Sequence, residues 1–144
     1  MSPEAGRADE AREWMAKVAG DLRAAKIDLG AEPPLVEDAL FHCQQAVEKA
    51  LKAFLAWNDR PFRKTHSLEE LGRECCTIDV GLETSVDEAA PLTEYAWAFR
   101  YPGAPPTPEL SEGEEALATA IRLVRAIVDR LPPEAVPSGI RGSI

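Results

Sequence analysis

Apolar side chains between residues 36 and 57 recur at alternating steps of four and three. This spacing keeps them on one side of an α-helix, because about 3.6 residues complete each turn. The pattern predicts a helix from Pro34 to Asn58, ended by the turn-forming sequence between Asn58 and Pro61. Its apolar seam consists of Val36, Leu40, Cys43, Val47, Ala50, Phe54 and Trp57.

Four further segments show helical periodicity, and no segment shows the alternation that is typical of a strand. They predict helices over residues 8–29, 67–76, 85–100 and 108–131. Gly30 is expected to end the first as a left-handed residue, and Ser67 to begin the third in a capping box with Glu70. Pro91 lies inside the fourth and is expected to kink or split it.

Sustained seams with short connections predict an all-α fold, an antiparallel bundle of four to five helices. We expect one domain over residues 1–144, with its core at about 8–131. Residues 132–144 are rich in Pro, Gly and Ser and are expected to form a mobile tail or an interaction arm. The three tryptophans are expected to anchor the core or a dimer: Trp14, Trp57 and Trp97.

Charge and hydropathy narrow the range of partners. The net charge of −9 over 144 residues disfavours a sequence-independent nucleic-acid binder, because Lys and Arg supply most phosphate-backbone affinity. No apolar run could cross a membrane and no secretory signal begins the chain, so we expect a cytoplasmic protein without a membrane partner. Cys43, Cys75 and Cys76 show no metal-ligand spacing and are interpreted as reduced, structural thiols.

The helix predicted over residues 34–58 also carries a polar stripe. Its members have the spacing of the apolar seam: His42, Gln45, Lys49 and Lys52. A plain surface helix would more often carry interspersed Glu and Lys. Two interpretations are open, a groove for a nucleotide or anion, or a semi-buried polar network or dimer contact.

Familiar catalytic and cofactor motifs are missing. The sequence contains neither phosphate-binding glycine motif and no His-Glu-x-x-His. His42 and His66 lie in separate segments, and neither follows a Glu by three residues as a di-iron bundle requires. We therefore expect no cofactor and no bound metal.

Three segments together resemble the HEPN domain family of bacteria and archaea. Residues 42–53 resemble its "QQA-x-EK-x-LKA" helix, and residues 65–71 its "T-H-x-L-x-x-L" start of the next helix. Residues 95–102, which end in Arg100-Tyr101-Pro102, resemble its "ARYP" segment. The three occur in the family's order and span most of residues 10–131.

The resemblance implies a four- or five-helix bundle that often dimerises. It also implies a place in toxin–antitoxin or stress-defence systems, commonly beside a small nucleotidyltransferase partner protein. Many HEPN proteins are metal-independent ribonucleases that pair an Arg with a His after four to six intervening residues. No His follows Arg100, and Arg60, six positions before His66, falls in a predicted loop, so the usual nuclease pair is absent.

We therefore interpret the chain as a HEPN-like interaction module, a homodimer that binds a nucleotide or an RNA phosphate. The candidate binding residues are Arg100, Tyr101, His66, Lys49, Lys52 and Gln45. Arg100 would grip a phosphate while Tyr101 stacks on a base; the competing interpretation of Arg100 is charge complementarity at a helix C-terminus. The alternative function is a ribonuclease toxin with a non-standard site built from Arg100, Tyr101 and His66, and a third is a small-ligand-binding bundle.

Overall fold

A computed structural model describes residues 2–103 and 105–144, and every regular element within these ranges is a helix. The α-helices are α1 (Pro3–Gly30), α2 (Val36–Trp57), α3 (Leu68–Ile78), α4 (Glu83–Ala89) and α5 (Leu110–Val128). Short 3-10 helices complete the chain: η1 (Val80–Leu82), η2 (Ala90–Ala96), η3 (Pro133–Ala135) and η4 (Ile140–Ser143). The all-α prediction is confirmed. In the ranges described, no helix combines the length and apolar character that crossing a membrane requires.

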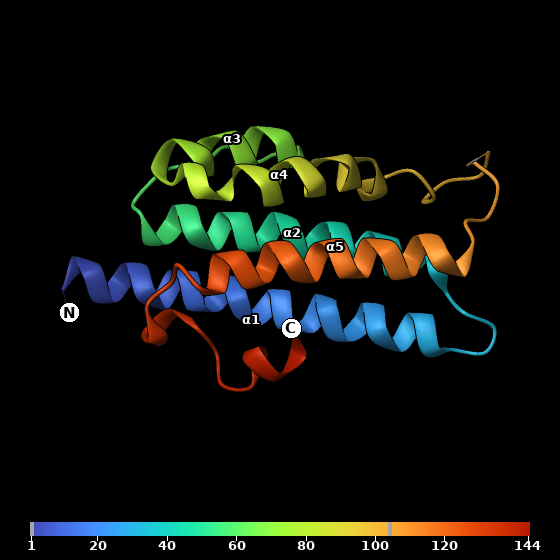
Figure 1. The fold of residues 1–144 in the computed structure, drawn as a ribbon, viewed down its shortest axis with the longest axis horizontal. Helices are drawn as coiled ribbons and strands as arrows, with labels where there is room; N and C mark the ends of the chain where they lie inside the picture. Colours follow the sequence, from blue (N-terminus) through green and yellow to red (C-terminus); the bar gives the residue numbers. More distant parts are fainter. Residues whose placement is uncertain (1, 104) are drawn as a thin grey trace.

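Helix α2 lies at the centre of the bundle. It packs against α1, α3, η2 and α5, which surround most of its circumference. Figure 1 shows α1 running opposite to α2, whereas α5 returns across the long connection after η2 and follows the direction of α2. Because α2 has neighbours on nearly all sides, even polar residues on it are buried: Gln44, Glu48 and Lys52.

The core contains the apolar seams that the sequence predicts. The inward residues of α1 are fully buried, among them Met15, Val18 and Leu22. Gly113 allows α5 to approach the end of α1 closely, since a Cβ there would lie 2.7 Å from Leu29 Cδ2. Trp14 and Trp57 are half-buried against the core, while Trp97 is exposed.

The ends of the first two helices differ from the prediction. Gly30 is not left-handed; it remains within α1, and Ala31 follows with φ −69°. The carbonyl of Asp28 accepts hydrogen bonds from the N–H groups of Ala31 and Leu35, which satisfies the helix end without a left-handed residue. Helix α2 begins at Val36 rather than at Pro34.

Only half of the predicted capping box forms at α3. Ser67 Oγ accepts a hydrogen bond from the N–H of Glu70 at 3.1 Å, as predicted. The N–H of Ser67 instead donates to Thr65 Oγ1 at 3.1 Å. The Glu70 carboxylate is drawn away because it accepts from Arg63 Nε at 2.8 Å.

Pro91 splits the fourth predicted helix. The α-helical part ends at Ala89, and the chain continues as the 3-10 helix η2 to Ala96. Residues 97–100 lie outside any helix. Proline lacks the N–H that an α-helix interior requires, which explains the change of helix type at this position.

The C-terminal segment folds back along α1, as Figure 1 shows. Ala135 and Ile140 are buried, so the segment covers part of the apolar surface of the bundle. Arg12 Nη1 donates to the carbonyl of Val136 at 2.9 Å, and Lys26 Nζ donates to the carbonyl of Ser143 at 2.6 Å. The structure thus places against α1 a segment that the sequence analysis expected to be a mobile tail or an arm.

Candidate functional site

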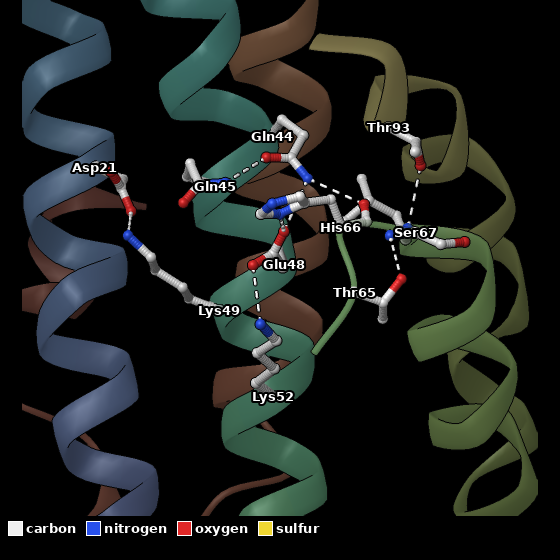
Figure 2. Close-up of polar contacts among 11 residues, drawn as sticks. Asp21, Gln44, Gln45, Glu48, Lys49, Lys52, Thr65, His66, Ser67 and Thr93 are labelled. Atoms are coloured by element: carbon white, nitrogen blue, oxygen red, sulfur yellow. Dashed lines mark hydrogen bonds and ion pairs between the residues drawn. The ribbon is translucent and has the colours of Figure 1, made fainter. Parts of the chain in front are cut away.

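The buried carboxylate of Glu48 is the centre of a polar network between α2 and the segment before α3 (Figure 2). Its Oε1 lies 2.8 Å from His66 Nδ1 and accepts a hydrogen bond from Gln44 Nε2 at 3.1 Å. Its Oε2 accepts from Lys52 Nζ at 3.0 Å. Both Glu48 oxygens therefore have partners although the side chain is only 5% exposed.

The surroundings of Glu48 favour its ionised form. Burial alone would raise the pKa of Glu48, since it penalises the charge. Hydrogen bonds from His66, Lys52 and Gln44, together with the charge of Lys52, outweigh burial and hold the pKa below its ordinary value. Lys52 is further stabilised by the rings of Trp14 and Phe62, whose centroids lie 5.3 and 5.7 Å from Nζ.

This network fixes the start of α3 on α2. Gln44 Nε2 also donates to the main-chain carbonyl of His66 at 3.2 Å. The N–H of Leu68 donates to Thr93 Oγ1 at 3.1 Å, which ties the same segment to η2. Gln44, Glu48 and His66, which belong to two of the three segments that resemble the family, thus hold helices together (Figure 2).

A second cluster joins α2 to α1 through Asp21. One carboxylate oxygen of Asp21 lies 2.8 Å from His42 Nδ1, and the other lies 2.8 Å from Lys49 Nζ. The Asp21 side chain is 9% exposed, so this is a largely buried contact. His42 and Lys49 therefore face a carboxylate from the neighbouring helix.

The structure divides the six candidate residues into separate groups. Gln45 donates to Gln44 Oε1 at 2.7 Å and so joins the Glu48 network with His66 and Lys52, whereas Lys49 pairs with Asp21. The polar stripe of α2 is thus divided between two semi-buried clusters, and carboxylates balance both of its lysines. A free anion would have to displace those carboxylates to bind here.

Arg100 lies apart from that network, in a cleft of about 400 Å³. Its guanidinium carbon is 4.5 Å from the centre of the Phe41 ring. Within residues 2–103 and 105–144, Arg100 makes no side-chain hydrogen bond and no salt bridge. Tyr101 is 72% exposed and does not line the cleft. The lining residues are Glu37, Asp38, Phe41, Tyr95, Phe99 and Arg100.

Five of these lining residues were not predicted. Tyr95 and Phe99 are one helical turn apart in sequence, and their rings stack with centroids 6.2 Å apart. The Tyr95 hydroxyl donates to Glu112 Oε2 at 2.8 Å, and burial, followed by this bond, raises its pKa. Tyr95 and Phe99 precede Arg100 closely in the sequence, so their spacing could have identified them as residues beside Arg100. Phe41 and the two acidic residues come from α2, which only the fold brings alongside.

The three thiols are free. Burial raises the pKa of Cys43 to about 12 and raises that of Cys75 further. A thiol must ionise to act as a nucleophile, so these two groups are poorly suited to that chemistry.

The helical bundle, with its α2 network and its Arg100 cleft, defines a compact all-α module without a ribonuclease-type Arg–His pair after Arg100. The chain matches the HEPN domain over residues 11–131 and belongs to that family. It is also similar to the crystal structure of TT1696 from Thermus thermophilus, with 27% sequence identity and a TM-score of 0.64. That similarity covers 85% of this chain and 98% of the other. No curated protein gives a significant match.

Proposed function

We propose that this HEPN domain protein is an interaction module that binds a phosphate group of a nucleotide or of RNA in the Arg100 cleft. The observation that carries the proposal is the guanidinium of Arg100. It is held over the Phe41 ring in a cleft, while no described carboxylate forms a salt bridge with it. An arginine held in this way keeps its N–H groups available for a phosphate.

The other walls of the cleft suit a nucleoside. Phe41, Tyr95 and Phe99 provide aromatic surface, on which a base can stack. Glu37 and Asp38 lie at the same cleft and offer acceptors for amino or hydroxyl groups, while they repel a phosphate from their side. Their charge favours one orientation, with the phosphate at Arg100 and the base or ribose towards α2.

A binding titration tests the proposal. ATP, GTP and a short single-stranded RNA would be titrated into the purified protein by calorimetry, with melting temperature as a second readout. Arg100→Ala should weaken binding by about 10- to 100-fold, the loss expected for charge-assisted hydrogen bonds. Arg125→Ala is the matched control, because Arg125 is an exposed arginine in the last turn of α5. Equal weakening by both variants, or no binding by the wild type, would refute phosphate binding at Arg100.

We further propose that the module forms a homodimer. Large apolar side chains are exposed on both sides of the connection between η2 and α5, among them Trp97 at 53% and Leu110 at 42%. Burying such residues against a second copy removes apolar surface from water. Light scattering after size-exclusion chromatography should give twice the chain mass, and Trp97→Ser with Leu110→Ser should shift the protein to monomer. A wild-type monomer at high concentration would refute the dimer.

The family resemblance supports a place in a toxin–antitoxin or stress-defence system with a small nucleotidyltransferase partner. A neighbouring gene for such a protein, and co-purification of the two chains, would support this role. Failure of the two co-expressed chains to associate would count against it.

The second candidate function, a ribonuclease toxin, is favoured by one observation. The His66 side chain is 65% exposed, and its Nδ1 faces the buried Glu48 carboxylate, an arrangement that orients an imidazole for general base catalysis. The Arg100 cleft does not include His66, so the two groups do not share one cleft. We expect no RNA cleavage by the purified protein. Cleavage that His66→Ala abolishes would favour the ribonuclease instead.

A further inference from the structure

Three potential metal ligands meet where α1 ends and α2 begins. Asp28 comes from the last turns of α1, and Asp38 and His42 are one turn apart on α2. One ligand atom from each of the three lies within 4.8 Å of the other two. A cluster of this size matches the distances between ligands that share one cation.

Asp28 shows that the cluster is more than a group of surface acids. The residue is only 8% exposed, and its Oδ2 is buried with no hydrogen-bond partner among the residues described. Burying a carboxylate oxygen without a partner is costly, and such groups are normally paired or bind a metal. Asp38, by contrast, has a side chain that is 59% exposed, so one side of the cluster is open to solvent.

The orientation of His42 is the second, independent indication. Its Nδ1 lies 2.8 Å from Asp21 Oδ1, while its Nε2 points to the cluster, 3.5 Å from Asp38 Oδ2. A metal-binding histidine characteristically donates its other ring N–H to a carboxylate, which selects the tautomer and fixes the ring. In this protein Asp21 is the carboxylate that faces the other ring nitrogen of His42. Lys49 Nζ lies 2.8 Å from the second oxygen of Asp21.

The electrostatics of the cluster agree with this geometry. Two carboxyl groups this close repel each other when both are ionised, and a bound cation would remove that repulsion.

We propose that Asp28, Asp38 and His42 bind a divalent transition-metal cation, with Mn²⁺ or Zn²⁺ as suitable ions, and that Asp21 positions His42. Two carboxylate oxygens and one imidazole nitrogen form a donor set that both ions accept. Solvent reaches the exposed side of Asp38, so coordination positions remain for water or a ligand. The sequence contains no short-range metal-ligand motif, and only the fold places Asp28 beside α2, so a metal site was not predicted.

The site lies next to the Arg100 cleft, since Asp38 lines both. The proposal does not depend on phosphate binding, and the two can be tested separately. A variant with Arg100→Ala should bind the cation as the wild type does, whether or not a nucleotide binds.

Direct metal titration tests the site. Protein treated with a chelator and dialysed would be titrated with MnCl₂ by calorimetry and by electron paramagnetic resonance, and then with ZnCl₂. We expect one ion for each chain and a melting temperature that rises with the ion concentration. Asp28→Asn and His42→Gln should each weaken binding by at least about tenfold, and Asp21→Asn by about 10- to 100-fold, as expected for a positioning residue.

Asp87→Asn is the matched control, because Asp87 is exposed on α4 and pairs with the exposed Arg73. It should bind Mn²⁺ with wild-type affinity. If Asp28→Asn fails to fold by circular dichroism, Asp38→Asn replaces it, since Asp38 is exposed. Wild-type protein that does not bind either ion at about 1 mM, or equal weakening by Asp87→Asn, would overturn the proposal.

Discussion

Glu48 and Asp28 are two buried carboxylates on neighbouring helices, with 4% and 8% of their surfaces exposed. Glu48 has a partner for each oxygen, and its hydrogen bonds and the Lys52 charge lower its pKa. Asp28 has an oxygen without any described partner, and burial raises its pKa. Burial alone therefore does not decide the role of a charged group. Its partners decide whether it holds helices together or stays available for a ligand.

The same difference separates the two sets of cations. Lys49 and Lys52 are neutralised by Asp21 and Glu48, whereas Arg100 lies over an aromatic ring in a cleft. The resembling segments on α2 and before α3 contribute Glu48, Lys52 and His66 to the paired network, whereas Arg100 belongs to the third resembling segment. We infer that the paired positions preserve the bundle, and that ligand binding is expected at the start of α2, near Asp38 and Phe41.

The largest expected effect comes from removing the centre of the paired network. Glu48→Ala leaves the buried Lys52 without its partner and should lower the free energy of unfolding by about 3–5 kcal/mol. Urea unfolding measures this difference. Glu69→Ala is the control, since the exposed Glu69 lies 3.9 Å from Arg73 and should contribute no more than about 0.5 kcal/mol. Similar losses of stability in both variants would show that the buried Glu48 network contributes no more than an exposed ion pair.

Acid should reveal the same network through proton binding. The pKa of Glu48 is lower in the folded chain than its ordinary value of 4.5, so the unfolded chain binds a proton first as pH falls. The stability from Glu48 is therefore complete above pH 4.5 and is lost as pH falls through the folded pKa. The free energy of unfolding, measured from pH 6 to about pH 2, should fall less steeply with decreasing pH for Glu48→Gln than for the wild type. Equal slopes would contradict this assignment.

A smaller effect is expected where the network meets α3. Ser67→Ala removes the hydroxyl that accepts from the N–H of Glu70 and should cost about 1 kcal/mol of stability. Ser67→Asp should retain most of it, because aspartate is also a good N-cap. If Ser67→Asp loses as much as Ser67→Ala, the cap does not stabilise α3.

The smallest change in stability is predicted at Arg100. Arg100→Ala removes a contact with Phe41 at an exposed position and should change the free energy of unfolding by about 0.5 kcal/mol. The same variant is expected to lose phosphate binding, so stability and binding should separate. A large loss of stability would assign Arg100 to the architecture instead, and the contrast with Glu48 would fail.

Several elements could be predicted because their signals are local. The seam of α2 and the Ser67 cap depend on residues a few positions apart, and both appear in the structure. The prediction for Gly30 was wrong because two later N–H groups satisfy the end of α1, one of them from Leu35. The capping box was only half right because Arg63, outside the motif, binds Glu70.

The candidate site was harder to predict because its partners are distant in sequence. Lys49 and Lys52 were chosen from the sequence as candidate binding residues, yet the carboxylate that binds Lys49 lies on α1, 28 residues earlier. Arg100 could be chosen from the sequence as a candidate residue, but Phe41 and Asp38 come to it only through the packing of η2 beside α2. No local pattern connects these segments.

The sequence by itself determined the helices, their apolar faces and the family, since the period of hydrophobic residues and the short motifs are properties of neighbouring positions. Only the tertiary structure decided which charged side chains have a partner of opposite charge and which do not. A carboxylate becomes a structural partner or a potential ligand according to what the next helix brings within about 3 Å of it, and helix packing sets that distance.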